Sequence, residues 1–474
     1  MNKFFTQNFS NTNSTNLCFN KFVFAVVATF TLLIANPAFA DGTKQVSPGN
    51  GAGVADANGT ALLVSPTQGS RPGSLADSKM YVRIQNFSAE SIYAGLMART
   101  FSNANTAIIN NAYLRITNPL GVVVFQQVIP NAGAGFIQNY NQAWNGPNIA
   151  GSNPAGYNHF NGGGAGTPTV TPTMNGDYLI EVYTSADGGG TYDGGTSSYP
   201  LFDFTVANGT TPIDGRLWSR EWGFVTTDLT VVPPNFNVGV ANGYPDPLSS
   251  AFVGDFFVHT NDGFVSRVNF QSGFRPLGFR LAMNFQGVGV SGVFTNDRRS
   301  INSNFTAPNT ITYNPLPSGY RVFLTRPEIV AFPNGPIGNP AITQGIYGCP
   351  GGYFIPYFLD QPGDVSILLD LNGTAGYQPA TSDVVLEAFN LLAGNNVMSW
   401  NGLNGLGVAV PPNFLANVTV TLYQGRINIP MIDAELNPNG FSVNSIHPAL
   451  GNRPLYWDDS LLSAFGAAPN ANAN

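Results

Sequence analysis

The sequence predicts an all-β protein of tandem β-sandwich modules, and three observations support this. Gly occurs 54 times and Pro 35 times in 474 residues, aromatic residues reach 12%, and short runs of alternating apolar and polar residues recur between the turns. Gly and Pro favour turns, whereas aromatic and β-branched residues favour strands. After residue 40 no apolar stripe keeps the helical period of 3.6 residues. We therefore expect many short strands and few helices.

Residues 1–40 have the pattern of a secretory signal peptide. A polar, Asn-rich stretch and Lys21 precede an apolar run from Phe22 to Ile34, and Ala38-Phe39-Ala40 forms a small-residue cleavage site before Asp41. The run is shorter than the roughly 20 residues that a membrane-spanning helix needs. The alternative, a membrane anchor, is disfavoured because no stop-transfer pattern follows. We expect a secreted, extracellular protein without a transmembrane segment in its mature chain.

The charge and the cysteine content limit which binding partners and which disulfide bonds can be expected. Charged residues are 9% of the chain, against about a quarter in typical soluble domains, and the net charge of −7 is spread without acidic or basic runs. Nucleic acid is therefore not an expected partner. Once residues 1–40 are removed, Cys349 is the single thiol, which excludes an intramolecular disulfide. We expect Cys349 to be buried; the alternative is an intermolecular bridge or a reactive thiol.

The first part of the mature chain is a leader followed by one predicted sandwich. Residues 41–78 are rich in Gly, Ser, Pro and Ala and are expected to be a flexible leader. A β-sandwich domain is expected over 79–212. The Asn145–Gly166 stretch is dense in Gly, Asn and Pro and is expected to be a surface loop. The expected strands are 80–84, 112–116, 121–125, 176–183 and 201–206.

A second β-rich domain is predicted over 213–345. It begins with the aromatic segment Arg216–Phe224. A hairpin is expected from two strands, Phe256–Thr260 and Phe264–Val268, joined by Asn261-Asp262-Gly263, because Asn and Gly tolerate the positive φ of tight turns. Further strands are expected over 279–285 and 320–325. The stretch 333–350, rich in Pro and Gly, is expected to be a linker.

A third sandwich is predicted over 360–460, with a tail at 461–474 that is expected to be disordered at its end. Its strands are expected at 363–371 and 417–423, and 383–392 is a helix or a strand. Between them lies Trp400-Asn401-Gly402, followed by Asn404-Gly405 and Val410. We expect Trp400 to anchor the core, and the two Asn-Gly pairs to make tight turns before the last strand.

These residues carry two resemblances. The spacing from Trp400 to Val410 resembles the small immunoglobulin-like module of flagellar hook-capping proteins, which implies an Ig-like or jelly-roll-like sandwich. The segment Arg216–Phe224, the hairpin Phe256–Gly263 and the closing segment Tyr456–Ser460 are similar to the N-terminal region of large Bacteroidetes gliding-motility-associated, adhesin-like surface proteins. Those proteins are type IX secretion cargo, which implies a location at the cell surface. Such proteins usually end in a conserved sorting domain, whereas this sequence ends in Ala-Pro-Asn-Ala-Asn-Ala-Asn, so we expect either the front part of a longer polypeptide or export to the surface by another signal.

No residue pattern points firmly to catalysis. His159, His259 and His447 are isolated, and no zinc, nucleophile-elbow or phosphate-loop spacing occurs. His259 with Asp262 is the one imidazole–carboxylate pair near a turn. Glu221, between Trp218 and Trp222, and Asp458-Asp459 beside Trp457 are glycosidase candidates, although an ion pair of Glu221 with Arg216 or Arg220 is the more ordinary interpretation. No catalytic or cofactor-binding residue is therefore predicted.

Two binding hypotheses remain open. A structural calcium ion could use oxygen atoms of Asp360, Asp364, Asp370 and Asn372, although turn-forming acids are the simpler explanation, so no metal ligand is assigned. The aromatic clusters Trp218-Trp222 and Tyr456-Trp457 could stack on sugars or fill a core, and a core is favoured.

The expected function is a non-enzymatic, secreted cell-surface structural or adhesin protein, part of an adhesin or filament. Its expected partners are other cell-surface or filament proteins, with surface glycans as a further candidate. The alternative is a secreted polysaccharide-processing enzyme or a carbohydrate-binding module.

Overall fold

The protein is all-β, as the sequence predicts. The computed structural model describes residues 41–46, 61–64, 79–100, 108–164, 166–193, 197–225, 252, 254–270, 274, 278–284, 303–307, 310–313, 319–429, 431–432 and 439–452. The signal peptide expected at 1–40 lies outside them. Among the described residues no helix has the length and apolar character needed to cross a bilayer. The short helices are α2 (Thr43–Val46), α3 (Tyr140–Asn145) and the 3₁₀ turn η1 (Ile149–Gly151).

Two large antiparallel sheets form what we call the body. The described strands of the first sheet run in the order β24 (Met431–Ile432), β13 (Gly278–Ala282), β10 (Glu221–Val225), β1 (Ala61–Val64), β7 (Ser197–Asn208) and β3 (Glu90–Thr100), with β8 (Thr211–Ile213) paired to β7. The second sheet has the order β26 (Gly451–Asn452), β25 (Phe441–His447), β12 (Val265–Phe270), β11 (Asp255–His259), β16 (Arg321–Phe323), β9 (Leu217–Ser219), β2 (Met80–Ile84), β6 (Gly176–Thr184), β4 (Ala112–Thr117) and β5 (Val123–Val128). A separate hairpin pairs β14 (Ser303–Ala307) with β15 (Thr310–Tyr313).

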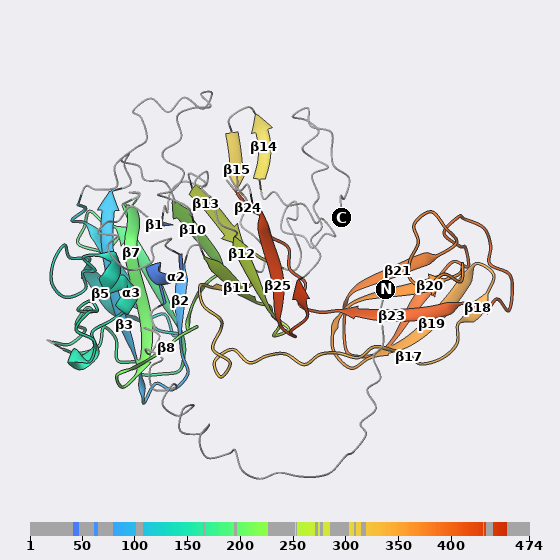
Figure 1. The fold of residues 1–474 in the computed structure, drawn as a ribbon, viewed down its shortest axis with the longest axis horizontal. Helices are drawn as coiled ribbons and strands as arrows, with labels where there is room; N and C mark the ends of the chain where they lie inside the picture. Colours follow the sequence, from blue (N-terminus) through green and yellow to red (C-terminus); the bar gives the residue numbers. More distant parts are fainter. Residues whose placement is uncertain are drawn as a thin grey trace, which may run out of the picture. The chain divides into compact units, whose positions relative to one another are not determined.

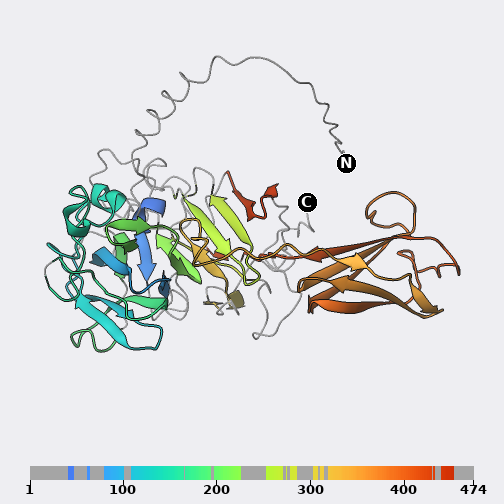
Figure 2. The ribbon, with the colours of Figure 1, turned by 90° about the horizontal axis from the view of Figure 1, so that it is seen from below.

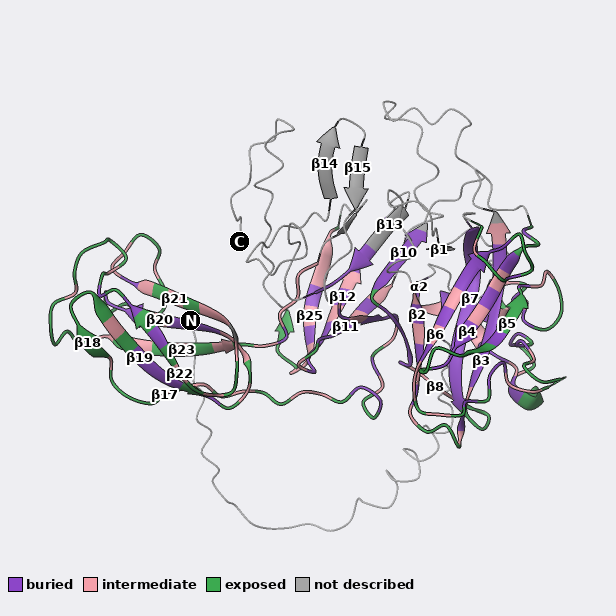
Figure 3. Ribbon diagram, turned by 180° about the vertical axis from the view of Figure 1, so that it is seen from behind, coloured by how far each residue is buried: buried purple, intermediate pink, exposed green. Residues whose placement is uncertain are grey.

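The core of the body lies between the two sheets, because alternate residues of their strands bury one face. In β2 the residues Met80, Val82 and Ile84 are buried while the two between them are not. β7 is buried along nearly its whole length, as its predominantly purple ribbon in Figure 3 shows. One continuous apolar cluster joins both sheets, with Phe204 and Trp222 from the first and Val82 and Val258 from the second. Burial of these side chains supplies the main stabilisation.

A second, smaller sandwich is inserted into this body, and we call it the inserted sandwich. One of its sheets contains β17 (Ala341–Ile342), β18 (Tyr347–Cys349), β19 (Gly352–Leu359) and β22 (Gly394–Trp400). The other has the order β21 (Val384–Leu391), β20 (Gly363–Asp370), β23 (Asn417–Tyr423). The strands are drawn in orange shades in Figures 1 and 2, and they enclose an apolar core of their own that includes Ile355, Ile367 and Trp400.

The strand pairings correct the expected domain boundaries. The expected boundary at 212–213 does not separate the sheets. Strand β9, from the second predicted domain, pairs with β2 of the first on one side and with β16 on the other, and β4, β5 and β6 belong to the same sheet. The third unit spans β17 to β23, not 360–460, since β24 and β25 pair with β13 and β12 of the body. The sandwiches are therefore nested in sequence, because strands distant along the chain complete the same sheet.

The leader expected at 41–78 also differs in part from the prediction. Val46 is fully buried in the core of the body, and Gly42 forms an antiparallel bridge with Asp203 of β7. β1 pairs with both β7 and β10, so it is a central strand of the first sheet. Composition alone suggests a loose chain here because few large apolar residues are present. The backbone hydrogen bonds of a central strand do not require them.

Candidate functional site

The aromatic and acidic residues considered for catalysis lie in or against the core. Trp222 is 1% exposed between the two sheets, and its indole nitrogen donates to the Val322 carbonyl at 2.9 Å. Trp218 is 5% exposed and stacks on Tyr81 with 4.3 Å between ring centroids. Glu221 is also buried, in β10. Neither tryptophan can stack on a sugar. The segment Tyr456-Trp457-Asp458-Asp459 lies outside the described residues.

His259 and Asp262 lie close together but have different hydrogen-bond partners. The Nε2 atom of His259 is 3.2 Å from the Pro333 carbonyl. The Asp262 carboxylate instead accepts a hydrogen bond from the Thr260 hydroxyl and, at 2.8 Å, one from the Gly425 amide. Gly263 follows with φ of +80°, as the predicted hairpin turn requires. The carboxylate is thus used to organise the turn, and no catalytic dyad forms.

The acids considered for calcium are each used in a local contact. Asp360 accepts from the Asn339 amide, Asp364 pairs with Arg426 at 2.7 Å, and Asp370 accepts from the Gly373 amide. Asn372 contacts Asp383, which the sequence reasoning missed. Burial favours the neutral acid, yet the amides of Gln378, Leu371 and Asn372 hold the pKa of Asp383 below its usual value. Within the part of the chain that the structure describes, no three His, Cys, Asp or Glu side chains gather as metal ligands would.

Cys349 corrects a further expectation, since its thiol is exposed at the end of β18. All three residues of this short strand are exposed, and a tight turn at Pro350 and Gly351 joins it to β19. An apolar residue type in a Gly- and Pro-rich segment suggests burial, and here the local turn outweighs that tendency.

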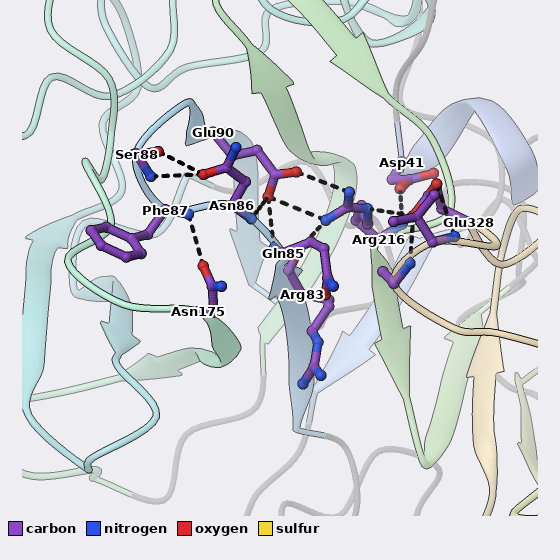
Figure 4. Close-up of polar contacts among 12 residues, drawn as sticks. Asp41, Arg83, Gln85, Asn86, Phe87, Ser88, Glu90, Asn175, Arg216 and Glu328 are labelled. Carbon is purple, nitrogen blue, oxygen red and sulfur yellow. Dashed lines mark hydrogen bonds and ion pairs between the residues drawn. The ribbon is translucent and has the colours of Figure 1, made fainter.

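Arg216 is the centre of a buried ion network in the body (Figure 4). Its side chain is 4% exposed, it donates to Glu90 at 3.0 Å, and its Nε lies 3.4 Å from Glu328. The Arg216 amide donates to the Asp41 carboxylate at 3.1 Å. The sequence suggests Glu221 as the partner of Arg216, and the structure gives it Glu90 and Glu328 instead. Because these charges pair with one another, the network joins β3, the residue before β9, the segment after β16 and residue 41 of the leader, and its role is structural.

Three carboxyl groups, those of Asp41, Asp203 and Asp214, lie near this network on the side of β7. Burial raises the pKa of Asp203 to about 8, against hydrogen bonds from Tyr157 and Thr205 that lower it. Burial and the charge of Asp41 raise the pKa of Asp214 to about 7, while Lys44 lowers it. One carboxylate oxygen of Asp203 is buried with no hydrogen-bond partner. The neutral, protonated form of this acid is therefore favoured.

The Trp400 motif has the geometry that the sequence predicts. Trp400 is 7% exposed in the core of the inserted sandwich, and its indole nitrogen donates to the Leu403 carbonyl at 2.9 Å. Asn401 accepts from the Leu403 amide, and Asn404 accepts from the amides of Leu406 and Val408. Gly402 has φ of +78°, and a Cβ there would lie 2.6 Å from the Tyr353 ring. Both Asn-Gly pairs therefore sit in tight turns.

The feature that sequence reasoning missed is an exposed apolar face on the inserted sandwich. Its members point outward from β18, β19 and β22, opposite the core, and we call them the outer aromatic face: Tyr347 (50% exposed), Phe354 (39%), Phe358 (40%) and Val397 (53%). Tyr347 lies opposite Phe354 in the ladder, with 5.6 Å between ring centroids. Val397 lies opposite Pro356, which shares the orientation of Phe354 and Phe358.

The two faces of the inserted sandwich differ in character. The strands β17, β18, β19 and β22 contain no charged residue, and only Asn395 and Ser399 add polarity beside the rings. On the other sheet, β23 exposes Asn417, Thr419 and Thr421, as a solvated strand does, and the exposed apolar residues are Tyr423 at the end of β23 and Val385 of β21. Alternation along β19 could have revealed the outer aromatic face, because Phe354 and Phe358 are out of phase with Ile355, Tyr357 and Leu359.

No family model matches the chain, and no curated protein matches it. Among solved structures the chain is similar to a DUF4785 family protein from Legionella pneumophila, with 10% sequence identity and a TM-score of 0.14, over 83% of this chain and 96% of that one.

Proposed function

We propose that this protein is a non-enzymatic, secreted cell-surface protein, a structural or adhesive component, whose inserted sandwich binds another surface or filament protein. The observation that supports this most is the outer aromatic face. Monomeric proteins seldom expose contiguous apolar surface without using it, and aromatic residues are enriched where proteins bind one another.

The chemistry of the face fits a protein partner. Tyr and Phe bury large areas at a low cost in side-chain entropy, and the face has no charge that would need to be desolvated. The surrounding Asn395 and Ser399 could supply a polar rim. The sequence pattern of a signal peptide supports the extracellular location. Burial of Glu221 and the contact of His259 with a backbone carbonyl support a binding role over turnover.

A second candidate is glycan binding through the same face. Tyr347 and Phe354 present adjacent rings at 5.6 Å, an arrangement on which pyranose rings can stack. This keeps the carbohydrate-binding alternative open, with residues different from the tryptophans considered from sequence.

Binding to intact cells of the producing organism tests the proposal. The labelled protein should bind saturably, and the double variant Phe354→Ser, Phe358→Ser should bind about tenfold more weakly or worse, as the loss of interface anchors does. Leu415→Ser is the matched control, because Leu415 is 95% exposed on the same module but lies in the loop before β23.

Pretreatment of the cells distinguishes the partners. Protease should abolish binding if the partner is a protein, whereas periodate should abolish it if the partner is a glycan. Equal binding by the double variant and the wild type would refute a role for the outer aromatic face.

A further inference from the structure

A cleft of about 530 Å³ lies against the outer side of the second sheet of the body. Arg83 of β2, His259 of β11 and Arg321 of β16 line it, together with the Asp262 carboxylate and the amide side chains of Asn261, Gln361 and Gln424. The cleft shares no residue with the outer aromatic face, so a ligand bound in it would be independent of the proposed function.

The strand register explains why these cationic groups gather. His259 and Arg321 are directly opposite one another in the ladder between β11 and β16, so their side chains share one side of the sheet. Trp218 of β9 lies between two aromatic neighbours in the sheet, with Tyr81 of β2 opposite it on one side and Phe323 of β16 opposite it on the other. Arg321 lies over the Trp218 ring at 5.3 Å and over the Phe332 ring at 5.7 Å. Aromatic rings thus form the floor on which the guanidinium rests.

The nearby carboxylate is already used by other groups. Asp177 pairs with Arg83 at 3.1 Å and accepts from the Trp218 indole at 3.3 Å. Among the described residues Arg321 has no carboxylate within ion-pair distance, and its Nε is buried without a hydrogen-bond partner. Burial lowers the pKa of Arg321, the charge of Asp177 raises it, and the charges of Arg83 and Arg220 lower it. The cleft is also lined by Asp262, whose carboxylate accepts from the Thr260 hydroxyl and the Gly425 amide. Since Arg83 is paired with Asp177, Arg321 is the cation left for an anionic ligand among the residues that line the cleft.

His259 adds an unused acceptor. Its side chain is 7% exposed, and Nδ1 is buried without a partner among the described residues. The contact of Nε2 with the Pro333 carbonyl at 3.2 Å requires the proton on Nε2. Burial lowers the pKa of His259, so the ring is neutral near pH 7 and Nδ1 accepts a hydrogen bond. A ligand that satisfies both groups brings an anion for Arg321 and a hydroxyl for His259.

We propose that this cleft binds an acidic saccharide unit, with its carboxylate on the guanidinium of Arg321 and a hydroxyl donating to Nδ1 of His259. Arginine suits this role because its planar fork matches a carboxylate. The amides of Asn261, Gln361 and Gln424 can both donate to and accept from the remaining hydroxyls. The volume is in the range of small-ligand sites.

Titration of the full mature chain with sodium glucuronate, followed by calorimetry or NMR, tests this site. Glucuronate should bind saturably, and glucose, which has the same ring hydroxyls without the carboxylate, should bind about tenfold more weakly or not at all. Acetate and sulfate are the probes for an anion alone, and both should be weaker than glucuronate. If either of them binds as tightly, the saccharide assignment is wrong.

Two variants locate the site. Arg321→Gln should weaken glucuronate binding about tenfold or more while leaving the melting temperature unchanged or higher, because it removes an unpaired, partly buried charge. Arg115→Gln is the control, since Arg115 also lies over a ring, that of Tyr183 at 4.8 Å, but pairs with Glu181 outside the cleft. Unchanged affinity in Arg321→Gln, or no saturable binding by the wild type, would overturn the proposal.

Discussion

At the scale of single residues, Trp400 shows how much one large side chain and its turn can determine. The indole fills the core between the two sheets of the inserted sandwich, and its nitrogen is satisfied by the Leu403 carbonyl of the same turn. Sequence alone predicts this, because an aromatic residue followed by two Asn-Gly pairs has few other uses. It does not predict the environments of Arg216 or Arg321, because their partners depend on strands far away in the chain.

Replacing Trp400 with Ala should destabilise the inserted sandwich by about 3–5 kcal/mol, the usual cost of an aromatic-to-alanine cavity. Leu406→Ala is the control, because Leu406 is 62% exposed in the same turn region and should change stability by less than about 0.5 kcal/mol. Urea denaturation followed by circular dichroism measures both values. Equal stability of the two variants would show that Trp400 does not anchor the core.

Exposure of Cys349 leads to a chemical prediction. In protein that begins at Asp41 this is the single thiol, so one equivalent of a maleimide or of a disulfide reagent should react with the folded protein. The reaction should need no denaturant, and its rate should be close to that of the same protein in urea. A thiol that reacts only after unfolding would place Cys349 in a core.

At the scale of elements, the alternation of apolar and polar residues predicts where the strands lie, but it does not predict which strands pair with one another. The residues of β2, β23 and the hairpin β11–β12 follow from period-two patterns and turn residues, which are local properties. The pairing of β1 with β7 and β10, or of β25 with β12, joins segments far apart along the chain. Such pairing depends on which buried faces meet, and a pattern within one segment does not contain that information.

Strand β7 gives a prediction on how stability depends on pH, through its buried residue Asp203. The pKa of Asp203 is about 8 in the folded protein and near 3.8 when unfolded, so the folded state holds its proton more tightly. Its contribution to stability is therefore complete below about pH 4 and is lost as the pH rises towards about 8. The difference in unfolding free energy should be roughly 2–5 kcal/mol. Asp203→Asn, which can still accept from Tyr157 and Thr205, should flatten this dependence in denaturant titrations.

The same carboxylate should make stability sensitive to where the processed chain begins. Gly42 lies opposite Asp203, and the Asp41 carbonyl accepts from the Phe204 amide at 3.1 Å. Cleavage after Ala40 would place an α-ammonium beside these acids, and an opposite charge lowers a carboxyl pKa. Protein that starts at Asp41 should thus lose less stability between pH 4 and 8 than protein extended by Ala38-Phe39-Ala40. Identical pH profiles would contradict this electrostatic role.

At the scale of the whole molecule, the insertion changes how the chain can be divided. The segment that enters the inserted sandwich and the segment that leaves it lie together, since the Gly338 amide donates to the Gln424 side chain at 2.8 Å. The Gly425 amide donates to Asp262, and the Gly335 amide donates to the Gly263 carbonyl in the same hairpin turn. Both ends of the insertion are therefore fixed at one place on the body, as tolerated insertions usually are.

Excision of the insertion tests this organisation. Joining Pro336 to Arg426 through about four Gly and Ser residues should leave a folded body, because the loop to be closed is short and the loss of closure entropy is small. The separate fragment 337–425 should also fold, since its core is its own. Both products should show cooperative melting and strand-rich circular dichroism.

As a control, cutting the chain at 212–213, where composition places a boundary, should unfold the body, because β2 and β9 would then belong to different fragments of one sheet. A stable 41–212 fragment together with an unfolded excised body would show that the chain is built of consecutive domains after all.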